Sequence, residues 1–408
     1  MSKDREELYF IRCKSPDGLG NCDIYMAKNM GNNEWGKVEN LGKNINSPEW
    51  DSHPSLSHTG DTLFFASNRK GGFGESDIYF SVRRKGKWQP ARNIGPVINT
   101  KGNDLSPFYH PRYPILYYSS TGNALNFGNF DIYKSSYERG IWGDPKNIGP
   151  LVNGEGDEYY FTIDSESKDL FYARSEGNRL SNLDLYSFPL PMEAQPLATT
   201  VFKGTLKDSV TGKPFNGIVS VLDLENGIEV APKFIRPDGS FEFDLINDSK
   251  YLLVIQGEEF FRIEQNIDLN GDTTMSFATP SINFLRLQFE SIEFNSSSSE
   301  ILDHMKTDLD KLMNFMLDNP SMHLVISGHT DSQGNANMNY ELSQRRADAI
   351  RAYLIEKGGV AEDRVEAIGY GSEKPIIAKE KTKEDRRINR RVEFEIEKVE
   401  EEVEGQSW

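Results

Sequence analysis

One short motif recurs at nearly constant spacing through the first half of the chain. The tripeptide Asp-Ile-Tyr, or Asp-Leu-Tyr in its last copy, begins at positions 23, 77, 131 and 184, so successive copies lie 54, 54 and 53 residues apart. Each of the first three copies is followed by a tryptophan and then by Asn-Leu-Gly or Asn-Ile-Gly. Because several landmarks stay in register, we interpret the first half as tandem copies of one structural unit.

The segments between these landmarks have the pattern of short strands separated by turns. Apolar runs such as Thr62–Ala66 and Asp77–Val82 flank the glycine-rich stretch 68–76. A period of about 50 residues with four short strands is typical of β-propeller blades. Four imperfect copies within residues 5–191 are few for a closed ring, so we expect an incomplete propeller and hypothesise that the chain is the C-terminal part of a longer protein. A closed four-bladed ring with paired first and last strands would contradict that hypothesis.

The two cysteines of the chain, Cys13 and Cys22, lie in the first repeat on either side of a turn. Nine residues apart across a hairpin, they are placed to meet on neighbouring strands, and a disulfide there would indicate an oxidising compartment. The alternative is that both are unpaired small apolar residues.

The middle of the chain, residues 200–283, follows a linker and alternates short apolar runs with turns such as Pro237-Asp238-Gly239-Ser240. About seven short strands in so few residues predict a small β-sandwich.

The periodicity changes from two to 3.6 within residues 284–398. Ser297-Ser298-Ser299-Glu300 is the pattern of a capping box, and the helix that we expect after it places Leu302, Met305, Leu309, Leu312 and Met316 on one stripe. A strand, a second helix from about Asn339 and two further strands follow. We therefore predict an α/β sandwich with its helices on one side of the sheet. The acidic tail 399–408 is expected to be a disordered end.

Several separated motifs in this last part resemble one family. They are Gly328-His329-Thr330-Asp331-Ser332-Gln333-Gly334, the helix segment 339–347, Gly369-Tyr370-Gly371 and Asn389-Arg390-Arg391-Val392-Glu393. Together they look like the OmpA C-terminal-like family, whose members associate with peptidoglycan. The first half resembles TolB-like propeller repeats, and the middle resembles the carboxypeptidase regulatory-like, transthyretin-type sandwich. The order of the three parts resembles envelope proteins of Bacteroidetes-type bacteria, some of them associated with type IX secretion.

The OmpA resemblance implies a site for diaminopimelate, whose side chain ends in an ammonium and a carboxylate on one carbon. Asp331 would accept the ammonium, and Arg346 would offer a planar fork to the carboxylate. The resemblance also implies contributions from Thr330, Asn339 and Arg390. A further implied contributor is Asn295, which lies where the first strand departs from the family pattern. The alternatives are that Asp331 caps a helix and that Arg346 lies on a solvated helix face.

Composition and motif searches limit the remaining functions. The 408 residues carry 63 acidic against 46 basic side chains and a net charge of −17, which argues against nucleic acid as a partner. The sequence holds no G-x-S-x-G, no H-E-x-x-H and no phosphate-binding loop, so we expect no enzyme, no metal site and no cofactor. No segment has the length and apolarity of a membrane helix, and no signal peptide precedes the first repeat.

The predicted function is non-covalent binding of the peptidoglycan stem peptide, which anchors an envelope protein to the cell wall. The resemblance implies a location on the periplasmic side of the outer membrane, and truncation at the N-terminus would explain the missing export signal. The alternative is a scaffold subunit of a secretion or transport complex, whose propeller binds an envelope protein partner.

Overall fold

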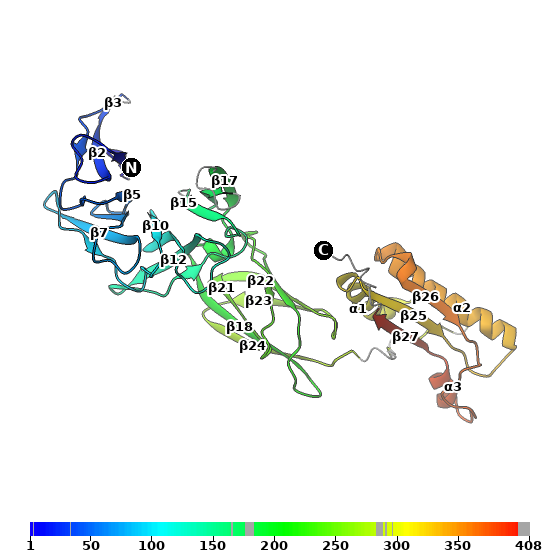
Figure 1. The fold of residues 1–408 in the computed structure, drawn as a ribbon. Coiled ribbons are helices and arrows are strands. Elements are labelled where there is room, and N and C mark those ends of the chain that lie inside the picture. The colour runs from blue at the N-terminus through cyan, green and yellow to red at the C-terminus, as the bar shows by residue number, and fades with distance from the viewer. Residues whose placement is uncertain are drawn as a thin grey trace, which may run out of the picture.

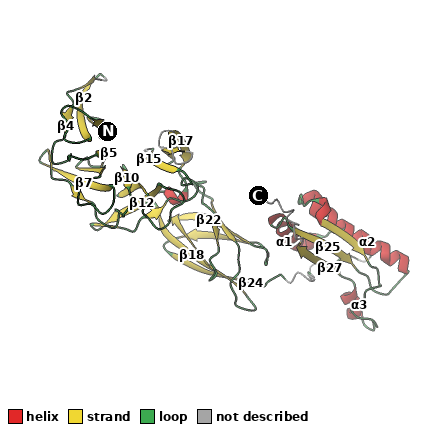
Figure 2. Cartoon of the chain, viewed as in Figure 1, coloured by secondary structure: helices red, strands yellow, loops and turns green. Residues whose placement is uncertain are grey.

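The computed structural model describes residues 1–2, 4–32, 34–164, 166–175, 183–282, 289, 292–295 and 297–398. Figures 1 and 2 show a chain of β-sheets that leads from the N-terminus to an α/β part, where the three α-helices lie. Mostly β-structure before an α/β domain is the order predicted from the sequence. The acidic tail and most of the expected first strand of the last part lie outside the described residues.

Four small antiparallel sheets, here called repeat sheets 1 to 4, form the first half. Sheet 1 contains β1 (Glu7–Cys13), β2 (Cys22–Gly31), β3 (Glu34–Trp35) and β4 (Glu39–Asn40). Sheet 2 contains β5 (Asp51–Leu56), β6 (Thr62–Ser67), β7 (Asp77–Arg84), β8 (Lys87–Trp88) and β9 (Arg92–Asn93). Sheet 3 contains β10 (Asp104–Tyr109), β11 (Ile115–Ser120), β12 (Asp131–Glu138), β13 (Ile141–Trp142) and β14 (Lys146–Asn147). Sheet 4 contains β15 (Asp157–Ile163), β16 (Asp169–Ser175) and β17 (Leu183–Pro189).

The four sheets do not close into a ring within the described residues. No strand of repeat sheet 1 pairs with a strand of repeat sheet 4 there, and β1 lies at the edge of its sheet, whereas its counterpart β6 lies between β5 and β7. The inner strands nevertheless converge, because the rings of His53 on β5 and Tyr160 on β15 are 5.2 Å apart. A partial propeller therefore stays a prediction.

The recurring motifs form the same hydrogen-bonded network in three sheets. In sheet 1, the side chain of Asn46 accepts a hydrogen bond from the backbone N–H of Ile24 at 2.8 Å and donates one to the carbonyl of Ile24 at 3.0 Å. Asn46 also donates to the side-chain oxygen of Asn40. The amide group of Asn40 in turn donates to Asp23 at 2.8 Å. The residues that repeat this pattern are Asp77, Asn93 and Asn99 in sheet 2 and Asp131, Asn147 and Asn153 in sheet 3. The aspartate of the motif is thus a buried hydrogen-bond acceptor beside apolar packing residues.

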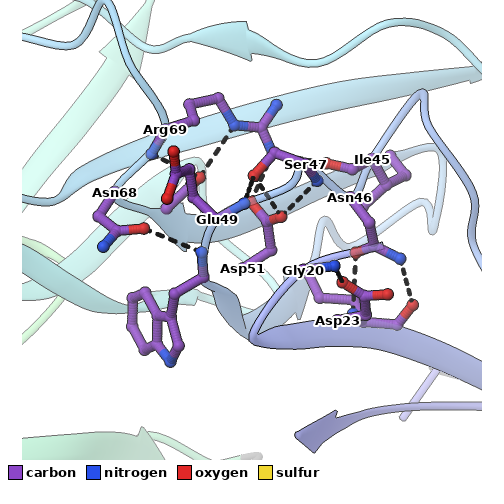
Figure 3. A network of polar contacts seen from close by, with 12 residues as sticks. Gly20, Asp23, Ile45, Asn46, Ser47, Glu49, Asp51, Asn68 and Arg69 are labelled. Carbon is purple, nitrogen blue, oxygen red and sulfur yellow. Dashed lines mark hydrogen bonds and ion pairs between the residues drawn. The ribbon is translucent and has the colours of Figure 1, made fainter. Parts of the chain in front are cut away.

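A second network links the loop before β5 to the start of that strand. Asp51, at the start of β5, accepts hydrogen bonds from Ser47 at 2.7 Å and from Arg69 at 2.6 Å, and Figure 3 shows it between these two side chains, beside Asp23 and Asn46. Its carboxylate is fully buried, so the arginine compensates the charge.

In sheet 1 the structure also joins Cys13 and Cys22, which pair across β1 and β2, by a disulfide.

Two sheets with one shared core form the middle part, after the short 3-10 helix η1 (Met192–Ala194). The strands are β18 (Ala198–Asp208), β19 (Ile218–Asp223), β20 (Lys233–Phe234), β21 (Ser240–Ile246), β22 (Ser249–Gln256), β23 (Ile263–Leu269) and β24 (Thr273–Thr279). Their order is β21-β18-β24 in one sheet and β20-β19-β22-β23 in the other. Alternate residues of β18 are buried, as period-two patterning requires when one face packs on a core.

The last part is a three-stranded sheet with helices. Its elements are α1 (Asp303–Asp318), β25 (Met322–Gly328), α2 (Ala336–Ala352), the π-helical turn η2 (Tyr353–Lys357), the 3-10 turn η3 (Glu362–Arg364), β26 (Val365–Gly369), α3 (Lys383–Asn389) and β27 (Val392–Lys398). The described strands have the order β26-β25-β27, with β25 parallel to β26 and antiparallel to β27. Helices α1 and α2 bury their apolar sides in one cluster with this sheet.

The capping box expected at Ser297–Glu300 is wrong. Helix α1 begins only at Asp303, and its N-cap is Leu302, although the stripe of Met305, Leu309 and Leu312 is buried as expected. The reason is a tertiary contact: the backbone carbonyl of Ser298 accepts a hydrogen bond from Arg346 at 2.9 Å, which holds the serine segment against α2. A local capping preference worth about 1 kcal/mol does not outweigh a charge-assisted bond to a buried guanidinium.

Candidate functional site

Three segments meet at the carboxyl end of β25: the loop that follows this strand, helix α2 and the end of α3. Their approach depends on glycine, because a Cβ at Gly328 would lie 2.3 Å from the carbonyl oxygen of Ser343 and one at Gly369 would lie 2.4 Å from the backbone nitrogen of Gln344. The glycines of two family-like motifs therefore let α2 lie directly on the strand ends.

Asp331 lies in the loop between β25 and α2, with 13% of its side chain exposed. Its Oδ2 accepts a hydrogen bond from Arg390 Nη1 at 2.6 Å, and its Oδ1 accepts one from the backbone N–H of Gln333 at 3.1 Å. The cap of α2 is Asn335, which accepts from Asn337 and Met338. Asp331 is therefore not the helix cap that was its alternative interpretation.

Thr330 and Asn339 flank this carboxylate. Asn339 donates to the carbonyl oxygens of Asp331 at 3.3 Å and Gln333 at 3.0 Å, so it fixes the shape of the loop. Thr330 is only 4% exposed, and its hydroxyl has no hydrogen-bond partner among the described residues. A buried hydroxyl without a partner is costly unless a ligand or water completes it.

Arg346 lies on α2 and is only 5% exposed, so it is not on a solvated face. Its Nε and Nη2 donate to the carbonyl oxygens of Ser298 at 2.9 Å and Asn295 at 3.0 Å, and its guanidinium carbon lies 5.2 Å from the ring centre of Phe294. Burial lowers the pKa of this guanidinium, and the nearby Arg390 acts in the same direction while Asp331 opposes it. Its charge is held by carbonyl dipoles and a ring face, and no carboxylate among the described residues is bonded to it directly.

A polar cavity of about 60 Å³ opens beside Arg346. Its lining residues are Ile292, Glu293, Phe294, Arg346, Arg387, Arg390, Arg391 and Val392. Four arginines against one glutamate make this cavity locally cationic on a chain whose net charge is −17. A volume of that size holds a few water-sized groups, which suits a carboxylate rather than a large ligand. The arginine forks match carboxylate geometry.

Three of the four lining arginines are paired with carboxylates. Arg387 donates to Glu293 at 2.7 Å and to Glu384, while Arg391, 7% exposed, donates to Glu393 at 2.7 Å. Arg390 donates to Asp331 at 2.6 Å. Arg346 is therefore the lining arginine that is held by backbone carbonyls instead of a carboxylate among the described residues.

The structure thus brings most of the residues predicted for this site together. Asp331 and Arg390 are bonded directly, Thr330 and Asn339 belong to the same loop and helix start, and Arg346 lines the same cavity as Arg390. Asn295 contributes differently from the expectation, because its backbone carbonyl, not its side chain, contacts the site through Arg346.

Two supporting residues were not found by sequence reasoning. Asn389 is fully buried; its side chain accepts from the backbone N–H groups of Ile376 and Ile377 and donates to Glu380 at 2.6 Å. Glu380 in turn accepts from the hydroxyl of Ser332 at 2.7 Å. This chain of bonds ties the Asp331 loop to the end of α3. The signal was present in the Asn389-Arg390-Arg391 motif, whose asparagine had been given no role.

This site defines a class of protein: an α/β domain with a small cationic cavity and a fixed aspartate–arginine pair at the strand ends. No group of three or more His, Cys, Asp or Glu side chains that could hold a metal ion occurs among the described residues. The family model of the OmpA family matches residues 293–390. The chain therefore belongs to the OmpA family through its C-terminal domain, and this family is a non-enzymatic one.

Named relatives match between about a quarter and a third of the chain. Outer membrane porin F of Pseudomonas aeruginosa is 41% identical over 131 residues, which are 32% of this chain and 35% of that protein. The peptidoglycan-associated lipoprotein of Pasteurella multocida is 33% identical over 101 residues, 25% of this chain and 67% of that protein. The crystal structure of the peptidoglycan-associated lipoprotein from Burkholderia pseudomallei is 28% identical, with 28% of this chain and 90% of that chain covered and a TM-score of 0.24.

The match has a limited extent. The chain spans about a third of the length of the Pseudomonas porins that it resembles, and the repeat sheets and the middle part lie outside the family match. Within the part of the chain that the structure describes, no helix is long and apolar enough to cross a membrane.

Proposed function

We propose that the C-terminal domain binds peptidoglycan non-covalently and that it recognises the diaminopimelate side chain of the stem peptide. The observation that carries the proposal is the cationic cavity, which is lined by the buried Arg346 and by Arg390, the arginine that is bonded to the Asp331 carboxylate. The names of the relatives support it, since several are peptidoglycan-associated lipoproteins. In this role the domain anchors its chain to the cell wall, on the periplasmic side of the outer membrane.

The ligand carboxylate binds between Arg346 and Arg390. Nε and Nη2 of Arg346 already donate to backbone carbonyls, so its guanidinium is held in one orientation before the ligand arrives. A fork fixed in this way loses little entropy when it binds a carboxylate. Arg390 is 44% exposed and completes the clamp from the open side.

The ligand ammonium binds at Asp331. In the structure Arg390 donates a hydrogen bond to Oδ2 of this carboxylate, so the two charges neutralise one another. A zwitterionic ligand offers Asp331 and Arg390 each a partner of the opposite charge. Binding therefore leaves neither charge unpaired and hardly changes the net charge of the site. The unpartnered hydroxyl of Thr330 supplies a neutral hydrogen bond beside it, and Asn339 keeps the loop in position.

Domain boundaries form part of the proposal. We place the repeats at 5–191, the regulatory-like sandwich at 200–283, the wall-binding domain at 284–398 and the tail at 399–408. A scaffold role, in which the repeats bind an envelope partner while the same C-terminal chemistry holds the wall, stays a prediction.

Cosedimentation of the full chain with purified sacculi tests the assignment. We expect pelleting with diaminopimelate-type peptidoglycan and much less with lysine-type peptidoglycan, which lacks the terminal carboxylate. Asp331→Ala and Arg346→Ala should each cost on the order of 2–5 kcal/mol of binding free energy, enough to abolish pelleting. Arg345→Ala is the matched control, because Arg345 is the neighbouring arginine but is 57% exposed. Equal pelleting of all three variants would falsify the site.

A further inference from the structure

The repeat sheets pack side by side and form three equivalent junctions, between sheets 1 and 2, 2 and 3, and 3 and 4, here called junctions 1, 2 and 3. Strand register identifies the equivalent positions. Arg83 pairs with Trp88 in sheet 2, and Tyr137 pairs with Trp142 in sheet 3, so Arg83 and Tyr137 are equivalent. Glu7 lies opposite Lys28 in sheet 1, and Thr62 lies opposite Val82 in sheet 2, so Glu7 and Thr62 are equivalent. The same groove can therefore be compared three times within one chain.

At junction 1 the groove is closed by an ion pair. Nη1 of Arg83 donates to both carboxylate oxygens of Glu7, at 2.9 and 2.8 Å, and Nη2 donates to the carbonyl of Gly60 at 2.9 Å. The same guanidinium lies 5.1 Å from the ring centre of Trp88. The arginine thus spans the groove from sheet 2 to sheet 1 and covers its aromatic wall.

At junction 3 the groove is filled by the chain itself, through the segment of η1. The hydroxyl of Tyr117 donates to the carbonyl of Ala194 at 2.7 Å, and Nζ of Lys134 donates to the carbonyl of Gln195 at 2.8 Å. Ala194 is fully buried and packs in the apolar cluster that contains Tyr117. A short polypeptide segment is therefore a natural occupant of this groove.

At junction 2 the groove is open. Its cavity of about 250 Å³ is lined by Ser57, Thr59, Asp61, Thr62, Phe64, Phe80, Val82, Tyr109, Tyr137 and Trp142. The positions of Glu7 and Arg83, which form the ion pair at junction 1, are occupied here by Thr62 and Tyr137. Tyr137 is 41% exposed. Phe64 stacks on Tyr109 at 5.0 Å and meets the edge of Trp142 at 6.2 Å, so the walls are rigid and aromatic.

The chemistry of this groove differs from that of junction 3 in two ways. At junction 2, Phe64 and Phe80 occupy the positions that Tyr117 and Lys134 have at junction 3. The two donors that bind backbone carbonyls at junction 3 are therefore missing from these positions, and the floor of the groove is apolar. Asp61 contributes one carboxylate, and no lysine or arginine is among the lining residues. A ligand of complementary charge is cationic.

We propose that the groove at junction 2 binds a short segment of a partner polypeptide that inserts one apolar side chain next to a lysine or arginine. The volume is below the roughly 300–1,000 Å³ of small-molecule pockets and accommodates a single side chain. Aromatic walls bury the apolar group, and Asp61 pairs with the neighbouring cation. This inference is independent of wall binding by the C-terminal domain.

A peptide probe tests the proposal on the full chain. The probe copies residues 189–197, which contain the junction 3 segment, with Glu193→Lys, so that a cation lies beside the methionine. The unchanged peptide is the matched control, because its glutamate would be repelled by Asp61. With fluorotryptophan-labelled protein, we expect the lysine peptide to shift the Trp142 resonance in a saturable way and to leave the Trp88 resonance in place. Trp142→Phe identifies the signal.

Two variants make the test specific. Thr62→Glu combined with Tyr137→Arg copies the closing pair of junction 1 and should remove the shift without lowering the thermal unfolding temperature. Asp61→Asn should weaken binding of the lysine peptide about two- to fivefold. The proposal is overturned if neither peptide moves the Trp142 resonance, if the shift persists in the closed double variant, or if a chitooligosaccharide moves the signal where the lysine peptide does not.

Discussion

The carboxylate of Asp331 and the guanidinium of Arg390 are 2.6 Å apart, and this ion pair joins the loop after β25 to the end of α3. Asp331 is 13% exposed and Arg390 is 44% exposed, so one partner is fixed while the other reaches in from solvent. In the proposed site, both charges exchange this partner for a zwitterionic ligand.

Arg390→Ala should weaken binding to diaminopimelate-type peptidoglycan, but less than Arg346→Ala does. The side chain of Arg390 is 44% exposed, and a partly solvated pair of this kind contributes up to about 1 kcal/mol, which corresponds to roughly a fivefold loss. Cosedimentation at rising sacculus concentration measures the change. Salt should reduce binding of the parent chain more than that of the variant, because the variant has lost an exposed charge. Tighter binding by Arg390→Ala would show that the arginine acts as a competitor of the ligand ammonium.

Arg346→Lys should abolish wall binding although the charge is kept. A lysine cannot donate to the carbonyls of Asn295 and Ser298 in the fixed directions that the guanidinium provides, and its ammonium would be buried with fewer hydrogen bonds. We expect a loss of more than about tenfold in affinity for diaminopimelate peptides, measured by calorimetry. Arg345→Lys is the control and should change neither affinity nor stability. Full binding by Arg346→Lys would mean that only the charge matters.

Sequence reasoning succeeded where the information is local or repeated. The 54-residue period predicted sheets that share one plan, because the same Asp and Asn residues satisfy the same backbone groups in sheets 1, 2 and 3. The period-3.6 stripe predicted α1, since burial of Met305 and Leu309 requires only local spacing.

Sequence reasoning failed where the decisive contact is distant in the chain. The serines at 297–299 have good capping propensity, yet Arg346, 48 residues beyond Ser298, holds that segment against α2. Asn389 acts through Glu380 and backbone groups of a loop, and nothing in its own neighbourhood shows those partners. Ring closure by the repeats depends on pairing between the ends of a long segment, which a short-range pattern does not encode.

Asn99→Ala should unfold repeat sheet 2 locally. The side chain of Asn99 is 2% exposed and bonds both the N–H of Ile78, at 2.8 Å, and its carbonyl, at 2.9 Å. Alanine leaves two buried backbone groups without partners, which costs about 2–4 kcal/mol in total. Hydrogen exchange should show lost protection over β6 and β7 and unchanged protection in the β18–β24 part. Asn266→Ala, at an exposed position, should change neither.

Glu158→Gln should remove part of the pH dependence of stability. Burial raises the pKa of Glu158 to about 7 from an ordinary 4.5, despite a hydrogen bond from Gly154 and the nearby Arg174. The folded chain therefore binds a proton that the unfolded chain releases between about pH 4.5 and 7, so stability falls as pH rises through this window. Burial also raises the pKa of Asp104, to about 6, which adds to the same trend.

The Glu158→Gln variant keeps the size and an acceptor oxygen but has no charge to bury. We expect it to be more stable than the parent at pH 8, by up to about 3 kcal/mol, and nearly equal to it at pH 4.5. Urea unfolding at several pH values, followed by fluorescence of the repeat sheets, measures the difference. Glu166→Gln is the control, because the side chain of Glu166 is 61% exposed. If the variant is instead less stable at pH 8, the ion pair of Glu158 with Arg174, at 3.1 Å, outweighs the burial of the carboxylate.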